Sequence, residues 1–185
     1  WYEKAAALGN AHAHFSLGIM YYCGRGMPES YTKASRWYDN PAAQKDSEAR
    51  HSVNNMLRQL AEQGVAEAQC NLGALYEWGN HMPWDYETAC CWYEKAAAQD
   101  DAAAQYRLGT MYHNGWGVPQ KFRTARGGYE AAAGQNHADA QKTLGDMYRY
   151  GEGIKQNDKK ACQWYKKAAA QGHEEAQKAL NALKG

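Results

Sequence analysis

The chain of 185 residues lacks several features that define common protein classes. Lys and Arg total 21 against 20 for Asp and Glu, so the formal net charge is only +1. Such a chain has no long-range attraction to phosphate backbones or anionic lipid, which argues against a sequence-independent nucleic-acid binder. No apolar run approaches the roughly 18 residues that indicate a membrane span. We therefore expect no nucleic-acid partner and no membrane insertion.

Targeting signals and cysteine frameworks are also missing. The N-terminal residues, WYEKAAALGN, are not a signal peptide, and we expect a soluble chain whose location is either cytoplasmic or in the bacterial envelope or secreted. The 5 cysteines are an odd number without a C-x-x-C pair, so neither a disulfide framework nor a zinc site is indicated. Most of them are expected to be packing residues, which favours reducing conditions weakly.

Phenylalanine and proline are scarce, with 2 Phe and 4 Pro beside 14 Tyr, 7 Trp and 18 Gly. This bias arises from repetition. Trp1, Trp37, Trp92 and Trp164 are each followed by Tyr, and the segments WYEKAAALG, WYEKAAAQD and WYKKAAAQG are nearly the same. Self-similarity of this kind is the signature of a repeat architecture.

The repeat is 36 residues long. The alanine that follows each Trp-Tyr segment, or its counterpart, serves as the origin of a unit, and the spacings between these origins are 36, 19, 36, 36 and 36 residues. We therefore expect a single array that consists of a partial repeat, one full repeat, one truncated repeat, three full repeats and a C-terminal capping helix. These segments are 1–12, 13–48, 49–67, 68–103, 104–139, 140–175 and 176–185.

Each full unit predicts a pair of antiparallel helices. Offsets 0, 4, 7 and 8 from the origin form one apolar helical stripe, as in Ala104, Leu108 and Met111. Glycines at offsets 11 and 13, such as Gly115 and Gly117, then stop the helix. A second stripe follows, in which Trp and Tyr fill the space between successive pairs and a small residue at offset 5 lets the backbones approach. Because a single pair would leave its apolar faces exposed to solvent, the pairs must stack into an all-α, α/α superhelical solenoid.

The repeated motif is A-x-x-x-L-G-x-M-Y, then G-x-G, then A-x-x-W-Y-x-K-A-A-x-Q-G, and it resembles the Sel-1-like repeat, a relative of the tetratricopeptide repeat. The resemblance covers essentially the whole chain and is most complete in residues 104–139 and 140–175. It implies a superhelix that binds a protein or peptide partner, often in bacterial secretion, envelope, virulence or signalling settings, without chemistry of its own. The expected function is that of a scaffold or adaptor without a cofactor. A passive spacer within a larger protein is an alternative.

One motif offers an enzymatic alternative. Ser30 and Lys33 form S-x-x-K, the nucleophile motif of penicillin-recognising enzymes, and would support weak β-lactam hydrolysis. However, Ser30 stands at offset 17, where other units have Asp85, Lys121 and Asn157, and this position suits the N-cap of the second helix. No K-T-G or S-D-N triplet accompanies it. We therefore expect no enzyme and no catalytic residue.

Metal and phosphate sites are not indicated either. His173 and Glu174 begin like H-E-x-x-H, but the second histidine is absent. His137 and His173 share offset 33 in the loops between units, so a whole repeat separates them and they cannot bind one ion. The G-x-G segments follow helices rather than strands, which is typical of turns and not of dinucleotide sites.

The surface that the packed stripe leaves free is the candidate binding site. At 100° per residue, offsets 2, 6, 9 and 10 point away from the stripe, toward the concave face of a solenoid. Aromatic and arginine side chains at these positions favour protein binding, because such residues contribute most at interfaces. The alternative is that these aromatics belong to the core. The predicted groove residues are Phe15, Ile19, Tyr22, Glu77, Trp78, Tyr106, Thr110, His113, Asn114, Lys142, Asp146, Arg149 and Tyr150.

The truncated repeat should disturb this regular array. It lacks a glycine turn, so the sequence predicts one continuous helix from about Ser47 to Gln63, ended by Gly64. Pro41 should cut the preceding helix short. One helix in place of two reverses the direction of the later pairs, and we expect a bend, an offset stack or a partner-covered seam near residues 40–65. Self-association through this unit or through the half repeat at the N-terminus is a further alternative.

Overall fold

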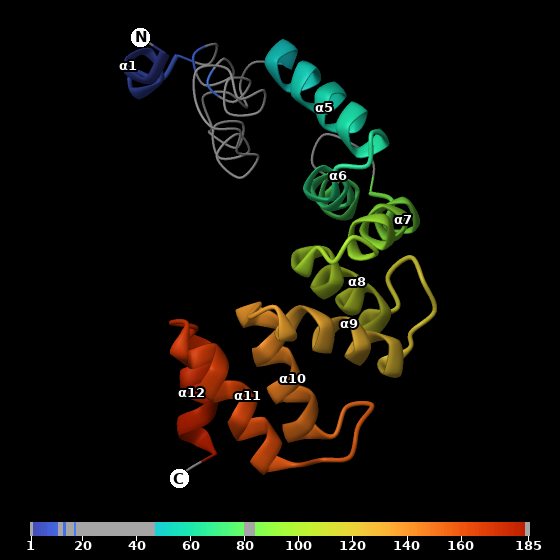
Figure 1. Ribbon diagram of the computed structural model, residues 1–185, viewed down its shortest axis with the longest axis vertical. Coiled ribbons are helices and arrows are strands. Elements are labelled where there is room, and N and C mark those ends of the chain that lie inside the picture. Colours follow the sequence, from blue (N-terminus) through green and yellow to red (C-terminus); the bar gives the residue numbers. More distant parts are fainter. Residues whose placement is uncertain (1, 11–12, 14–16, 18–46, 80–83, 184–185) are drawn as a thin grey trace. The chain divides into compact units, whose positions relative to one another are not determined.

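The computed structural model describes residues 2–10, 13, 17, 47–79 and 84–183, and over these residues the chain is all-helical without a strand (Figure 1). The helices are α1 (Tyr2–Ala7), α5 (Ser47–Glu62), α6 (Ala66–Trp78), α7 (Tyr86–Ala97), α8 (Ala102–Asn114), α9 (Phe122–Gly134), α10 (Ala138–Tyr150), α11 (Asp158–Ala170) and α12 (Glu174–Ala182). The predicted all-α class is confirmed. The chain divides into two compact units, Trp1–Gln63 and Gly64–Gly185, which are described separately.

The first unit contains α1 and α5. Helix α5 is continuous from Ser47 to Glu62, and Gly64 follows with a positive φ of 91°, so the predicted fusion of the truncated repeat into one helix is confirmed. Its side chains Leu57 and Ala61 are buried, as the apolar spacing predicts. The proline-shortened helix expected before it lies outside the described residues.

The second unit is a stack of helix pairs, α6 with α7, α8 with α9, and α10 with α11, followed by α12. Each helix packs against the next one along the chain, as Figure 1 shows from green to red. Helix α12 lies in the predicted capping segment 176–185 and buries Ala176 and Leu180 against α11, at offsets 0 and 4 of the predicted stripe. This is the α/α arrangement that the period predicts.

The turns within pairs use the predicted residues. Gly79, Gly115 and Gly151 end their helices in the left-handed conformation, which costs glycine little. At offset 17, the side chains of Asp85 and Asn157 each accept a backbone N–H of the second helix at 2.9 Å. The predicted helix caps are therefore confirmed at these two positions.

The core of each pair is built around one tyrosine. Tyr93, Tyr129 and Tyr165 are fully buried, and each ring contacts the glycine at offset 5 of its own pair, where a β-carbon would collide with it. The preceding tryptophans behave differently. Trp92 and Trp164 are only half-buried, with a lysine ammonium group over each ring. Tyrosine, more than tryptophan, thus fills the space that the repeated glycine opens.

Glutamine side chains join each first helix to the loop that ends its repeat. The amide of Gln99 donates to Gln69 at 2.9 Å, and the same bond links Gln135 to Gln105 at 3.0 Å. In the last full repeat Gln171 donates to Gln141 at 2.8 Å. The recurrence at offsets 1 and 31 satisfies glutamine side chains that are buried in the three repeats of the second unit.

Candidate functional site

The predicted groove positions of the second unit lie on the first helices of the three pairs. We call the surface that they form on α6, α8 and α10 the first-helix face. Its described residues are Glu77, Trp78, Tyr106, Thr110, His113, Asn114, Lys142, Asp146, Arg149 and Tyr150. Phe15, Ile19 and Tyr22, which were predicted with them, lie outside the described residues.

At α6, a buried carboxylate anchors an exposed aromatic ring. Glu77 accepts a hydrogen bond from the Tyr93 hydroxyl at 2.5 Å and forms an ion pair with Arg107 of α8 at 3.3 Å. The guanidinium of Arg107 also lies 4.6 Å from the centroid of the Trp78 ring. Because Glu77 holds Arg107 and Arg107 lies on Trp78, this ring is positioned at the surface although 55% of the residue is exposed.

At α8, the predicted residues are more closely packed. The half-buried Tyr106 ring stacks on His137 with centroids 4.8 Å apart and also contacts the Tyr129 ring. The Tyr129 hydroxyl donates to Thr110 at 3.4 Å. His113 meets Phe122 edge-on and is 3.6 Å from the Glu152 carboxylate, while Asn114 is exposed. These side chains therefore take part in packing as well as lining the face.

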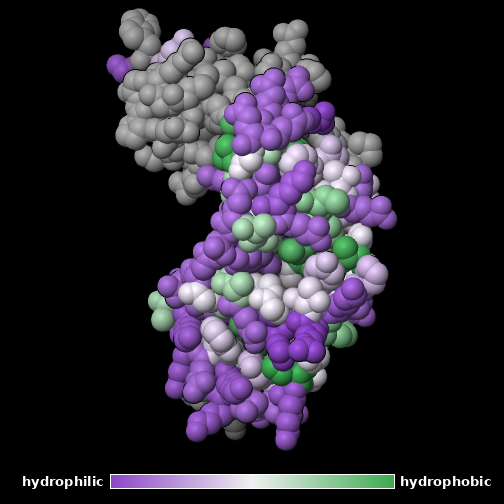
Figure 2. Space-filling model, turned by 45° about the vertical axis from the view of Figure 1, so that its right-hand side comes forward, coloured by the Kyte–Doolittle hydropathy of each residue, from purple (hydrophilic) through white to green (hydrophobic). Residues whose placement is uncertain are grey.

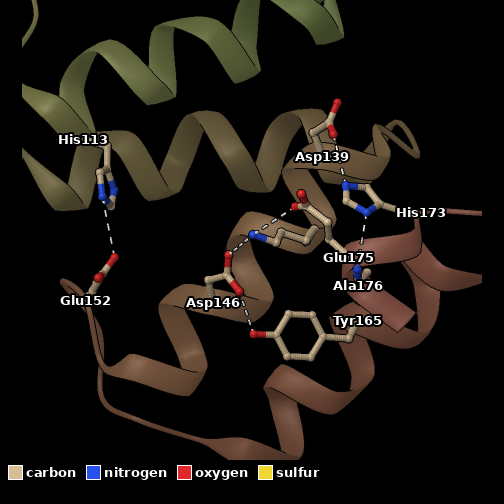
Figure 3. Close-up of polar contacts among 9 residues, drawn as sticks. His113, Asp139, Asp146, Glu152, Tyr165, His173, Glu175 and Ala176 are labelled. Atoms are coloured by element: carbon tan, nitrogen blue, oxygen red, sulfur yellow. Dashed lines mark hydrogen bonds and ion pairs between the residues drawn. The ribbon is translucent and has the colours of Figure 1, made fainter. Parts of the chain in front are cut away.

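At α10, a lysine lies between two carboxylates (Figure 3). Lys142 is 2.8 Å from Asp146 and 3.7 Å from Glu175 of α12, and Asp146 also accepts the Tyr165 hydroxyl at 2.7 Å. Burial opposes the charge of Lys142, but the hydrogen bond and charge of Asp146, together with the charge of Glu175, raise the pKa of the ammonium group. The opposite charges that the sequence placed on this helix are thus in direct contact.

The end of α10 carries the second exposed aromatic ring of the face. Tyr150 is 64% exposed, and the guanidinium of Arg149 lies 5.4 Å from its ring centroid. Tyr150 occupies the same repeat offset as Trp78, two repeats earlier. An arginine accompanies the aromatic ring at both positions.

The buried tyrosines link this face to the core. In each pair, the hydroxyl of the tyrosine at offset 25 bonds to a predicted groove residue, which is Glu77, Thr110 or Asp146. Burial, with the neighbouring carboxylate, raises the pKa of Tyr93 and Tyr165 well above 10, so these hydroxyls remain donors. Sequence reasoning identified these tyrosines as packing residues and missed their hydroxyl contacts, as it missed Arg107 and Glu175.

Possible metal ligands and thiols form no site in the part of the chain that the structure describes. No cluster of three His, Cys, Asp or Glu side chains there could hold a metal ion. Burial raises the pKa of the Cys70 thiol to about 12 and that of Cys90 to about 11, which leaves both thiols protonated. Ser30 and Lys33 lie outside the described residues. None of the described helices is long and apolar enough to cross a membrane.

The two loop histidines are helix caps. The Nδ1 atom of His137 accepts the N–H of Ala140 at 3.3 Å, and His173 caps α12 in the same way. Figure 3 shows His173 between this contact and Asp139, whose carboxylate is 3.1 Å from Nε2. The sequence placed both histidines in loops between repeats but did not indicate capping, since histidine is not among the preferred N-cap residues.

The cap at His137 predicts a pH-dependent stability. Burial, which disfavours the charged imidazolium, lowers the pKa of His137 below its ordinary value of 6.5, and the neutral ring accepts the Ala140 N–H through Nδ1. The unfolded chain binds this proton more readily, so the contribution is complete above about pH 6.5 and is lost as the pH falls through that value and the folded pKa. We expect the melting temperature to fall more between about pH 7 and pH 5 in the native chain than in His137→Asn, which keeps a cap that does not titrate. Equal slopes would contradict this role.

A family model described as Sel1 repeat matches residues 1–10, 11–44, 66–101, 102–137 and 138–173. The matched full repeats begin two residues before the origins inferred from the sequence and leave out residues 45–65, which contain the whole of α5. More than half of the chain is therefore covered by the motif that its period suggested.

Solved structures with similar folds are repeat proteins. A protective antigen of uropathogenic Escherichia coli with an SLR fold is 33% identical, with a TM-score of 0.66 over 97% of this chain and 34% of its own. A Sel1 repeat protein from Oxalobacter formigenes has the same identity and TM-score over 99% and 67%. Helicobacter pylori cysteine rich protein B is 26% identical, with a TM-score of 0.56 over 69% and 97%.

Curated relatives are longer proteins. DAP3-binding cell death enhancer 1 of Rattus norvegicus is 27% identical over 55% of this chain and 23% of its own length. The ERAD-associated E3 ubiquitin-protein ligase component HRD3B of Arabidopsis thaliana is 28% identical over 52% and 13%. The chain thus spans less than a quarter of these relatives. The repeated motif, the helix pairs and the family match together establish that this chain belongs to the Sel1 repeat family.

Proposed function

We propose that this chain is a protein-interaction scaffold that holds a segment of a partner protein on the concave side of its repeat stack, along the first-helix face. Sel1 repeat proteins are interaction scaffolds, and two relatives are named for binding DAP3 and for membership of a ubiquitin ligase. The observation that carries the proposal is the pair of exposed aromatic rings, Trp78 and Tyr150, each accompanied by an arginine. Trp, Tyr and Arg dominate the binding energy of protein interfaces.

The spacing of these rings supports an extended segment as the ligand. They are two repeats apart, which corresponds to four helix layers of about 8–10 Å each, or roughly 32–40 Å. An extended peptide of about 10–12 residues covers that length at about 3.3 Å per residue. Between the rings, the exposed side chain of Asn114 is available to bond such a segment, whereas Thr110 and His113 are half-buried and already contact Tyr129 and Glu152.

The surface in Figure 2 is consistent with recognition through a few anchors. On the face shown, the described residues are largely hydrophilic, and apolar areas are small and separated by polar side chains. A broad apolar interface of the obligate type would need a larger continuous patch. Individual aromatic anchors, with polar contacts between them, suit a reversible scaffold better.

Selection of peptides from a displayed library tests this function. Peptides of about 12 residues, selected on the native chain, should bind Trp78→Ala/Tyr150→Ala at least about thirtyfold more weakly, because hot-spot side chains contribute about 2 kcal/mol or more. The matched control is Trp116→Ala, which removes an exposed aromatic residue that stacks on Tyr86 at the start of α7 and is not one of the first-helix face residues. It should leave the affinity within about twofold. Selected peptides that bind the double variant as tightly as the native chain would overturn the proposal.

A further inference from the structure

A second surface, on helix α11, concentrates positive charge that the rest of the chain does not show. Five exposed lysines fall between residues 155 and 167, with Asp158 as the single acid among them, whereas the whole chain has a net charge of +1. In the described part of the chain, none of these five lysines forms an ion pair with a carboxylate. They are Lys155, Lys159, Lys160, Lys166 and Lys167.

Three of these lysines surround an open depression with an aromatic floor. Its lining residues are Tyr148, Lys160, Gln163, Trp164, Lys166 and Lys167, and its volume is about 430 Å³. The Lys160 ammonium lies 5.1 Å from the Tyr148 ring centroid, and that of Lys167 lies 4.3 Å from the Trp164 ring centroid. Both rings are anchored in the core, so they hold two ammonium groups in place at the surface.

Comparison with the other repeats shows that this charge is particular to α11. At the position of Lys166, α7 has Glu94 and α9 has Glu130. Glu94 accepts the Tyr112 hydroxyl at 3.3 Å, and Glu130 is 3.4 Å from Arg126, so the acid serves local contacts in those repeats. Helix α11 packs in its repeat as α7 and α9 do in theirs, but it carries Lys166 where they carry a glutamate. Folding therefore does not require Lys166, and its charge remains available to a ligand.

We propose that this surface, the α11 lysine patch defined by Lys160, Lys166 and Lys167, binds an acidic segment of a partner protein. Carboxylates complement the unpaired ammonium groups, and such complementarity governs the specificity and rate of association. An acidic peptide fits better than a nucleic acid, because lysine ammonium groups already lie over the rings of Tyr148 and Trp164, on which bases would stack. This site is formed by α11 and by Tyr148 of α10, and none of its lining residues belongs to the first-helix face.

A charge-reversal experiment with a matched control tests the patch. The probe is a fluorescein-labelled peptide of about 12 residues that alternates glutamate and alanine, measured by fluorescence anisotropy at low ionic strength. Lys160→Glu/Lys166→Glu/Lys167→Glu should weaken its binding at least about tenfold. The control, Lys95→Glu/Lys121→Glu/Lys178→Glu, changes the net charge equally at exposed lysines and should weaken binding less than about twofold. Both variants should keep the native circular dichroism, since all six lysines are exposed.

The remaining measurements separate this proposal from others. Trp78→Ala/Tyr150→Ala should bind the acidic probe like the native chain, so the patch stands even where the first-helix proposal fails. Added salt should weaken the probe's binding, as expected for exposed charges. Equal losses in the patch and control variants, no measurable binding, or tighter binding of a single-stranded oligonucleotide of equal charge would overturn the proposal. Self-association that the patch variant abolishes would also overturn it, because a second copy would then be the ligand.

Discussion

Replacement of Tyr93 by alanine should lower the free energy of unfolding by about 3–5 kcal/mol, the range observed for truncation of large buried aromatic side chains. Tyr93 of α7 is completely buried. Its core cluster includes Cys70 of α6 and the Ala104 and Met111 side chains of α8. Removal of the ring leaves a cavity that three helices border. Gly73, which contacts the ring, has no side chain that could fill this cavity. Urea unfolding followed by far-ultraviolet circular dichroism measures the loss. A change below about 1 kcal/mol would show that the ring does not hold the pairs together.

The tyrosine hydroxyls can be tested apart from the rings. Tyr93→Phe keeps the ring and removes the bond to Glu77, which stays paired with Arg107, so a loss of about 1 kcal/mol is expected. Tyr129→Phe removes a longer, neutral contact of 3.4 Å to Thr110 and should cost less. The order of these two losses distinguishes a hydroxyl that satisfies a buried carboxylate from one that makes a long contact with a neutral hydroxyl.

The helices could be predicted from the sequence because the signals that begin and end them are local. Gly115 and Gly151 follow their helices directly, and Asp85 and Asn157 directly precede theirs and accept the backbone N–H three residues further on. The continuous α5 follows from the missing turn in the same way. Periodicity of 3.6 residues also identified the buried stripe, since Ala140, Leu144 and Met147 are all buried.

Contacts between helices that do not follow one another in the chain could not be predicted in that way. Arg107 of α8 reaches Glu77 of α6, 30 residues earlier, and Lys142 of α10 reaches Glu175 of α12. Which side chains meet depends on the rotation of one pair against the next, and a single helical wheel does not contain this angle. The same limit applies to Tyr106. A helical wheel of α8 places it away from the packed stripe, but its ring stacks on His137, in the loop before α10.

The second glycine of each turn has one role that the sequence predicts and another that only the structure shows. The sequence explains Gly117 as a turn residue, and its φ of 69° agrees. The structure adds that a methyl group at this position would overlap the backbone of Tyr86 and Glu87, at the start of α7 in the preceding repeat. One repeat later, a methyl group at Gly153 would overlap the side chain of Phe122, at the start of α9. The second glycine thus lets neighbouring repeats approach, in addition to turning the chain.

Gly117→Ala should therefore destabilise the chain much more than Gly115→Ala. Both residues have positive φ values, 69° and 74°, so each alanine incurs roughly 1–2 kcal/mol for the left-handed conformation. At Gly115 the nearest atom to a new methyl group is 3.4 Å away, which is an ordinary contact. At Gly117 the collision is with backbone, which cannot rotate aside, and overpacking adds about 1–3 kcal/mol. We expect a total loss of about 2–5 kcal/mol for Gly117→Ala.

A third substitution separates this effect from helix propensity. Gly127→Ala lies within α9, where a new methyl group meets no atom within 4 Å, and should stabilise the chain by about 0.5–1 kcal/mol. Urea unfolding of the three variants, with the denaturant slope compared to the native value, gives the three free energies. If Gly117→Ala and Gly115→Ala lose the same stability, the turn conformation alone accounts for both, and the contact with α7 does not limit how closely the repeats pack. A larger loss at Gly117 means that this backbone contact restricts the distance between adjacent repeats.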